Sequence, residues 1–353
     1  MHMADALISP AVGGAMWAVS GGLIGYGAKK VREEADDRKI PLMGVLGAFI
    51  FAAQMINFSI PGTGSSGHLG GGMILSILLG PHAAFLVMAS VLTVQALFFA
   101  DGGLLALGCN IFNMGFFTCF IAYPLIYRKL VCGSLDKKRV LLGAVLAGIV
   151  GLQLGAFSVV LETVFSGVSE LPFKTFVFLM QPIHLAIGLV EGLVTAGVVS
   201  FATAARPEIL TAAAERTPLG GSVKKAALGI AGAAILIGTG LSWFASADPD
   251  GLEWAMLRTS GQEALESRGK LRGVLASWQE KTAFLPDYSF KKDVSAAEAV
   301  LAGKAAAEPG AGGKSAWPAV DSGTSAAGLV GGVMTLLLAA LIGIALKKRN
   351  AAA

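Results

Sequence analysis

The chain has 353 residues, of which 54% are hydrophobic and 14% are charged. Soluble domains carry about 25% charged residues, so this composition excludes an ordinary soluble protein and indicates a polytopic membrane protein surrounded by the lipid bilayer. The net charge is only +4 and the basic residues cluster in loops, so membrane topology accounts for them and no nucleic-acid partner is predicted.

The first part of the chain predicts a bundle of membrane-spanning helices in an all-α fold. Its uncharged runs have room for about seven spans at roughly 20 residues each. From Ile40 to Tyr127, for example, the single Asp, Glu, Lys or Arg residue is Asp101. We place the spans at about 9–28, 40–58, 69–80, 83–100, 104–127, 140–165 and 175–205. Residues 1–205 are therefore interpreted as one seven-span membrane domain.

A different module is expected after a polar cytoplasmic linker at residues 206–225, which contains two prolines. In residues 226–353, hydrophobic runs at about 226–245 and 323–346 enclose a polar segment at 246–321, and a basic tail follows. This pattern predicts two anchor spans around a small extracytoplasmic segment. Aromatic residues of that segment are candidates for a small core of its own: Trp254, Trp278, Phe284, Tyr288 and Phe290.

The distribution of Lys and Arg predicts the orientation in the membrane. The loops at 29–39, 128–139 and 206–225 and the tail hold 17 of the 27 basic residues, whereas the short connections between them hold only Lys174. Basic loops remain in the cytoplasm. Nine spans in the cytoplasmic (inner) membrane then place the N-terminus and the 246–321 segment outside and the C-terminus inside. His2 and His68 fall on the same extracytoplasmic side.

Two histidines suggest a transition-metal site. His68 lies in the glycine-rich stretch from Pro61 to Gly72, between two hydrophobic runs, and His2 directly follows Met1. The amine of Met1, the backbone nitrogen and the imidazole of His2 can occupy three corners of a plane around one ion, and His68 could occupy the fourth. Nitrogen-rich planar sites select Ni(II) or Cu(II), and less strictly Co(II). A histidine beside Met1 is also often incidental, so the pair alone does not decide.

At these residues the chain resembles a known family, the CbiM and NikM substrate-capture (S) components of energy-coupling factor (ECF) transporters for cobalt and nickel. The resemblance covers roughly residues 1–205 and is carried by MHMADALISP at the start, GTGSSGHLGGG around His68, QALFFADGGLLALGCNIFNMG from Gln95, and QPIHLAIGLVEGLVTA from Gln181. The commoner family start has Pro-Asp-Gly after residue 3, whereas this chain has Ala4-Asp5-Ala6.

The resemblance implies both a site and a role. The metal ligands would be Met1, His2 and His68. The chain would capture Ni²⁺ or Co²⁺ outside the cell and deliver it inward, for cobalamin biosynthesis or nickel enzyme maturation, with no permanent cofactor. A transmembrane coupling protein and an ABC ATPase pair would be its partners and supply the energy. The same motifs serve both metals, so the choice between nickel and cobalt stays open.

The second module has a resemblance of its own. The residues Asp248-Pro249-Asp250-Gly251-Leu252-Glu253 are similar to the PDGLE segment of small two-span accessory proteins of nickel and cobalt importers. The resemblance implies that an accessory protein is fused here to a capture component, which explains why the chain continues beyond seven spans. It leaves the role of residues 246–321 open.

Other polar residues in the hydrophobic runs are candidates for the cavity or for outer-shell contacts to the ligands. His184 and Glu191 are two helical turns apart on one face, and ionisable residues inside a span are functional candidates. Asp101, Asn110 and Asn113 could line the cavity or orient His68. Hydrogen bonding between helices is the alternative role for His184 and for both asparagines.

Sequence motifs narrow the function class. The chain contains neither a GxxxxGK[ST] nor an HExxH motif, so we interpret it as a transporter component that does not itself hydrolyse ATP rather than as an enzyme. Two alternatives remain open. One is a membrane-embedded enzyme that uses His68 and His184 with Asp101 or Glu191, and the other is a membrane metal sensor.

Overall fold

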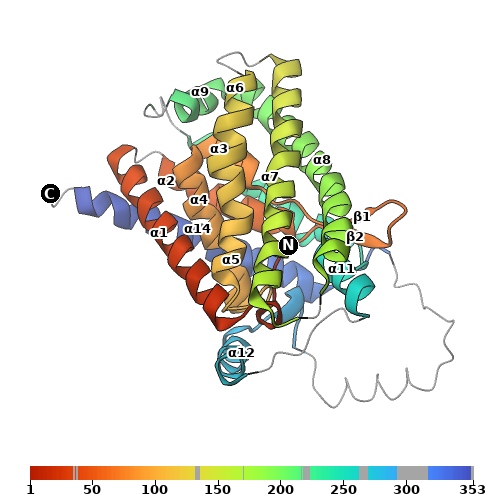
Figure 1. Ribbon diagram of the computed structural model, residues 1–353. Helices are drawn as coiled ribbons and strands as arrows, with labels where there is room; N and C mark the ends of the chain where they lie inside the picture. Colours follow the sequence, from red (N-terminus) through yellow and green to blue (C-terminus); the bar gives the residue numbers. More distant parts are fainter. Residues whose placement is uncertain are drawn as a thin grey trace.

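The computed structural model describes residues 1–34, 36, 39–131, 136–169, 171–215, 217, 223–261, 269–291 and 317–350. Helices dominate these residues, and a short hairpin of β1 (Phe58–Ile60) and β2 (Ser65–Gly67) lies at one side of the helix bundle (Figure 1). Five helical stretches are long and apolar enough to cross a bilayer: 81–98, 107–131, 137–166, 173–205 and 322–347. The predicted class of all-helical membrane protein is therefore confirmed.

The first module forms a helix bundle in which each predicted span contains helical residues, although residues 55–58 and 69–71 of the spans predicted at 40–58 and 69–80 are not helical. Its elements are η1 (Asp5–Leu7), α1 (Pro10–Glu34), α2 (Lys39–Gln54), α3 (Gly72–Leu79), α4 (Pro81–Phe98), α5 (Leu107–Ile111), the π-helical η2 (Phe112–Tyr127), α6 (Arg128–Val131), α7 (Lys137–Ser166) and α8 (Phe173–Ala205). α5, η2 and α6 follow one another without a break, and α7 packs along α8.

The segment expected as a span at 69–80 is built differently from the others. Helix α3 has only 8 residues, all buried, and it begins after the glycine-rich loop has already entered the bundle. At 1.5 Å per residue it is about 12 Å long, which is far less than the roughly 30 Å of a bilayer core. Loop and helix together therefore occupy the place of a single span. Gly71, with φ of +78°, provides the left-handed turn that leads from the loop into α3.

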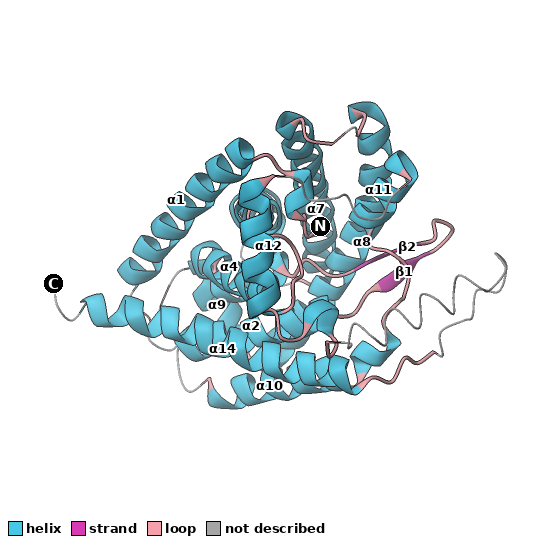
Figure 2. Ribbon diagram, turned by 90° about the horizontal axis from the view of Figure 1, so that it is seen from below, coloured by secondary structure: helices cyan, strands magenta, loops and turns pink. Residues whose placement is uncertain are grey.

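After the first module come α9 (Pro207–Glu215) in the linker and then α10 (Lys224–Thr239), η3 (Leu241–Phe244), α11 (Gly251–Ser260), α12 (Lys270–Thr282), η4 (Pro286–Tyr288) and α14 (Ser322–Asn350). Helices α10 and α14 lie side by side and both contact α2 (Figure 2). The first anchor helix, α10, ends at Thr239, whereas the sequence predicted a span that continues to about residue 245. The expected linker at 206–225 contains α9, and its residues 216 and 218–222 lie outside the described part of the chain.

The described residues of the polar segment, 246–261, 269–291 and 317–321, pack against the bundle instead of forming a separate core. The ring of Tyr288 stacks on Phe99 of the first module with centroids 5.2 Å apart, and Phe284 contacts the same ring at 6.1 Å. Trp278 and Phe290 are 64% and 55% exposed, so they do not form the small core considered from the sequence. Helix α12 lies at the end of the bundle where the first residues of the chain are held (Figure 1). There the Arg272 guanidinium donates to the carbonyl of Ile8 at 2.7 Å.

Candidate metal centre

The amino-terminal residues enter the bundle as an extended tail. Met3 is fully buried, and its backbone is held on both sides by the amide of Asn110: Met3 N–H donates to Asn110 Oδ1 at 2.8 Å, and Asn110 Nδ2 donates to the Met3 carbonyl at 3.2 Å. Gly103 N–H donates to the same carbonyl at 2.9 Å. These bonds satisfy main-chain groups that would otherwise be unpaired in an apolar surrounding. They fix the position of Met1 in the interior.

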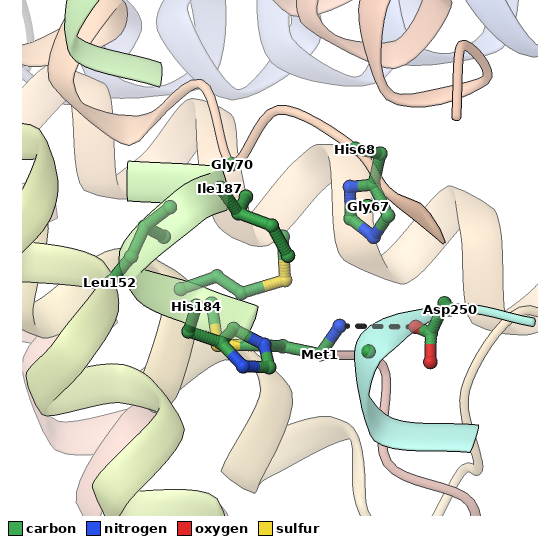
Figure 3. Close-up of a pocket in the computed structure, with 10 residues that line it drawn as sticks. Met1, Gly67, His68, Gly70, Leu152, His184, Ile187 and Asp250 are labelled. Atoms are coloured by element: carbon green, nitrogen blue, oxygen red, sulfur yellow. Dashed lines mark hydrogen bonds and ion pairs between the residues drawn. The ribbon is translucent and has the colours of Figure 1, made fainter. Parts of the chain in front are cut away.

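The free amine of Met1 reaches a small internal cavity (Figure 3). The cavity measures about 10 Å³, which is the space of a single water molecule or ion. Its lining comes from both modules: Met1, Gly67, His68, Gly70, Met114, Leu152, His184, Ile187, Asp250 and Gly251. The amine nitrogen lies 3.3 Å from Oδ2 of Asp250. A histidine from the glycine-rich loop and a carboxylate from the second module thus flank the amino terminus.

His68 presents an available lone pair in this position. Its Nδ1 lies 3.0 Å from the carbonyl oxygen of Leu69, which can only accept, so Nδ1 carries the proton. The other nitrogen, Nε2, is buried and has no hydrogen-bond partner among the described residues. Burial, together with the nearby amino-terminal charge, lowers the pKa of His68 to about 4. The imidazole is therefore neutral at physiological pH, which is the form that binds metals.

His2 lies against His68, with ring centroids 5.1 Å apart and the planes inclined by 25°. Burial and the amino-terminal charge lower the pKa of His2 to about 3, so this imidazole is neutral as well. Its ring nitrogens lie near two acceptor oxygens: Nε2 is 3.2 Å from Gln95 Oε1, and Nδ1 is 3.3 Å from Asp101 Oδ1. The neutral ring has a single N–H, so it can donate to only one of them at a time. His2 therefore lies next to the cavity without lining it.

The structure thus brings Met1, His2 and His68 to one place. Among the residues that it describes, no three His, Cys, Asp or Glu side chains form a group that could hold a metal by themselves. The donor set expected from the sequence is not made of side chains alone, because it combines the two imidazoles with the Met1 amine and the backbone nitrogen of His2. The ring of His2 would have to leave Asp101 or Gln95 before it could donate to an ion in the cavity.

Glu191 holds the loop that carries His68. Its carboxylate accepts the backbone N–H of Gly70 at 2.9 Å and that of Gly71 at 3.0 Å. The two amides immediately precede α3, where backbone N–H groups have no partner within the helix and the helix dipole favours a negative charge. A carboxylate buried in α8 therefore fixes a glycine-rich turn two residues beyond His68.

His184 lines the cavity, and the remaining candidates lie around the tail. His184 Nδ1 lies 2.8 Å from the carbonyl of Met180, one turn earlier in α8. Asp101 contacts His2 rather than His68 and accepts a hydrogen bond from Tyr288. Asn113 donates to Glu162 at 2.7 Å and lies 3.7 Å from the sulfur of Met3. Asp101, Asn110 and Asn113 therefore contact the tail and not the loop of His68.

Three further residues belong to this region although the sequence analysis assigned them no role: Gln95, Glu162 and Asp250. Gln95 and Glu162 are polar residues in largely apolar helices. Polar residues inside a membrane span are functional candidates, so the sequence could have indicated both. Asp250 was visible as part of a motif, but nothing in the motif indicates contact with a residue 249 positions earlier. Burial raises the pKa of Asp250, but the amino-terminal charge opposes this effect, and the resulting pKa lies below its usual range.

Two known families match successive parts of the chain. Residues 2–209 match the family described as "Cobalt uptake substrate-specific transmembrane region". Residues 224–348 match the PDGLE domain. The first match includes His2, His68 and the helices α1 to α8. The second includes Asp250 and the helices α11, α12 and α14.

Individual relatives agree with these matches. A protein of Archaeoglobus fulgidus, provisionally named fused nickel transport protein NikMN, is 39% identical over 210 residues, which are 60% of this chain and 68% of that one. The cobalt transport protein CbiM of Sorangium cellulosum is 32% identical over 190 residues, or 51% of this chain and 80% of that one. A crystal structure titled as a truncated transition metal transporter is 32% identical, with a TM-score of 0.52 over 58% of this chain and 99% of that one.

Proposed function

The chain belongs to the CbiM family of cobalt uptake substrate-specific transmembrane proteins and also carries a PDGLE domain, and from this premise we propose that it captures Ni²⁺ or Co²⁺ at the extracytoplasmic face. It is a membrane component of cobalt or nickel transport. In the proposed mechanism the captured ion passes inward through reorientation of the loaded subunit. Partner ATPases of an ECF importer supply the energy.

The observation that carries the proposal is the convergence of Met1 and His68 on one cavity of ion size. Met1 and His68 both line this cavity, the Nε2 of His68 has no hydrogen-bond partner among the described residues, and the imidazole is neutral. Nitrogen donors suit late first-row dications and are poor ligands for Mg²⁺ or Ca²⁺, which take oxygen ligands. This chemistry supports capture of a transition metal in preference to the abundant hard cations.

The complete donor set would be the Met1 amine, the backbone nitrogen and imidazole of His2, and the imidazole of His68. His2 reaches the ion by turning its ring away from Asp101 and Gln95, which lie within 3.3 Å of the ring nitrogens. Four nitrogens in a plane match the geometry that Ni(II) prefers, and Co(II) accepts such a set less strictly. Both cations therefore belong to the proposed substrate class.

The orientation in the cytoplasmic membrane is inferred from charge. Helices α6 and α9 lie at one end of the bundle, whereas α12, which contacts Ile8 through Arg272, lies at the other (Figure 1). The basic stretches 128–139 and 206–225 include α6 and α9, and positively charged loops face the cytoplasm. This arrangement supports an extracytoplasmic N-terminus, and the basic tail at 347–349 supports a cytoplasmic C-terminus.

Helix α1 supports the proposal that a membrane protein binds beside it. A Cβ atom added at Gly14, Gly21, Gly22 or Gly25 would meet no described atom within 4 Å, so one face of α1 is open. Small residues allow two membrane helices to approach closely, and this is the usual basis of their association. The coupling protein of an ECF transporter, with its ABC ATPases, is the partner that we assign to this face.

Blocking the amino terminus tests the proposed site. A short extension ahead of Met1 should abolish uptake of Ni²⁺ and Co²⁺ and remove the bound metal from the purified protein, because the amine is converted to an amide. The same extension placed after Ala353 is the matched control, and it should leave uptake and metal content unchanged. Normal metal content in the N-terminally extended protein would refute the site.

A further inference from the structure

Asp250 of the PDGLE domain divides its two carboxylate oxygens between two tasks. Oδ1 accepts the backbone N–H groups of Leu252 and Glu253, both at 2.8 Å, and thereby caps the N-terminus of α11. Oδ2 lies 3.3 Å from the amine of Met1. The cap fixes the direction of the side chain, so Oδ2 is held toward the amine by the local fold of the second module.

The segment before α11 is anchored to the strand that leads to His68. Ser66 N–H donates to the carbonyl of Pro249 at 2.8 Å, and the Ser66 hydroxyl donates to the carbonyl of Asp248 at 2.7 Å. Asp250 also forms an isolated parallel bridge with Ser66. Residues 248–250 therefore run beside β2, and their position relative to the loop of His68 is fixed by main-chain contacts.

Residues of the second module also close the cavity. Gly251 follows Asp250 and lies so near to α8 that an added Cβ would be 2.7 Å from Ile183 Cγ2 and 3.2 Å from His184 Cε1. The side chains of Met1 and Asp250 are 5% and 17% exposed. The contact between amine and carboxylate is thus mostly shielded from water, unlike the surface ion pairs that contribute little.

We propose that Asp250 is a positioning residue of the metal centre, through which the PDGLE domain orients the Met1 amine for coordination. An amine that coordinates a metal keeps two N–H bonds. One of these can continue to donate to Asp250 Oδ2 while the lone pair points to the ion, as outer-shell carboxylates do for other nitrogen ligands. This inference rests on the proposed function, because it presumes that the amine is a ligand.

The variant Asp250→Asn tests whether residue 250 orients the Met1 amine, while it keeps the N-terminal cap of α11. Asparagine caps helices as well as aspartate does, but its single carbonyl oxygen is then occupied by the amides of Leu252 and Glu253. The amine loses its acceptor while α11 remains capped. With NiCl2 as the probe and the full chain carrying its native N-terminus, we expect affinity about 10–100-fold lower than wild type, the usual cost of removing an outer-shell partner.

Two matched variants make the result specific. Asp248→Asn alters a neighbouring carboxylate that contacts Ser59 and Ser246 but not the amine, and it should bind nickel as the wild type does. Glu253→Ala removes the capping box without touching the amine, and its nickel affinity should fall less than that of Asp250→Asn. An equal loss in Glu253→Ala would show that the effect comes from the stability of α11, and it would overturn the inference.

The visible spectrum of the nickel complex supplies a readout that a merely structural role would not move. If Asp250 orients the amine from the outer shell, saturated Asp250→Asn protein should show the wild-type ligand-field bands at higher nickel concentration. Changed bands would make Asp250 a direct ligand, and wild-type affinity would deny it any role; either result refutes the inference. Retained nickel binding after N-terminal extension would instead refute the metal site itself, so the two failures are distinguishable.

Discussion

The imidazoles of His2 and His68 lie stacked with their centroids 5.1 Å apart, although one follows the chain terminus and the other belongs to the loop before α3. Each ring is buried, and burial lowers the pKa of His2 to about 3 and that of His68 to about 4. A stacked pair of neutral imidazoles beside an amine places several nitrogen donors within a small volume.

Replacing His68 should remove the imidazole whose Nε2 faces the cavity. We expect His68→Ala to lower nickel affinity by more than the roughly 100-fold that marks the upper range for outer-shell partners. Titration of the purified protein with NiCl2 measures the loss. His82→Gln is the control. His82 lies at the N-terminal end of α4 and does not line the cavity, so this variant should bind nickel as the wild type does. Wild-type affinity in His68→Ala would exclude His68 as a ligand.

Replacing Glu191 should release the loop rather than remove a ligand. The carboxylate accepts hydrogen bonds from Gly70 and Gly71, and leaving such buried donors unsatisfied costs about 1–3 kcal/mol. We therefore expect Glu191→Ala to unfold at a lower temperature and to bind nickel more weakly, with unchanged ligand-field bands at saturation. Bands that differ from those of the wild type would show that Glu191 itself binds the metal.

Adding a methyl group at Gly251 should lift α11 from α8. The new Cβ would lie 2.7 Å from Ile183 Cγ2, and forced overpacking of this kind costs about 1–3 kcal/mol. We expect Gly251→Ala to exchange bound nickel with an added chelator faster than the wild type, because the cover of the cavity is displaced. Gly232→Ala, where the added Cβ meets no described atom, is the control. Equal exchange rates in both variants would contradict the prediction.

Large side chains on the open face of α1 should abolish metal uptake and leave metal binding intact. Gly21→Leu and Gly22→Leu add side chains at positions where an added Cβ would meet no described atom within 4 Å, so the metal centre should keep its nickel affinity. Uptake by cells that contain all transporter subunits should be lost, because the partner helix can no longer approach closely. Co-purification of the coupling protein measures the contact directly. Unchanged uptake and co-purification would place the partner elsewhere.

The helices could be predicted from the sequence because uncharged runs of about 20 residues have few alternatives in a bilayer. The expected span at 69–80 was the exception. Composition does not reveal that a glycine-rich loop enters the bundle and leaves only the 8 residues of α3 to form a helix. That outcome depends on Glu191, whose carboxylate pairs the loop amides from a helix far away in the sequence.

The proximity of Met1, His2 and His68 was expected from their shared side of the membrane, and the structure places them together. The direction of the His2 ring was not predictable, because it is set by Gln95 and Asp101 in three dimensions. The position of Asp250 could not be foreseen either, since the chain between the two modules does not specify how they pack. For the same reason, the sequence could not show that Tyr288 of the polar segment packs on Phe99 of the bundle rather than in a core of its own segment.

The contact between Met1 and Asp250 joins the first residue of the chain to a residue of the second module, 249 positions later in the same polypeptide. Two groups on the same chain meet at an effective concentration fixed by the connecting segments, which lies in the millimolar range for short flexible linkers. How often this contact forms is therefore independent of how much protein the cell makes. Every molecule synthesised carries its own copy of the carboxylate, so capture component and accessory domain are always present in equal numbers.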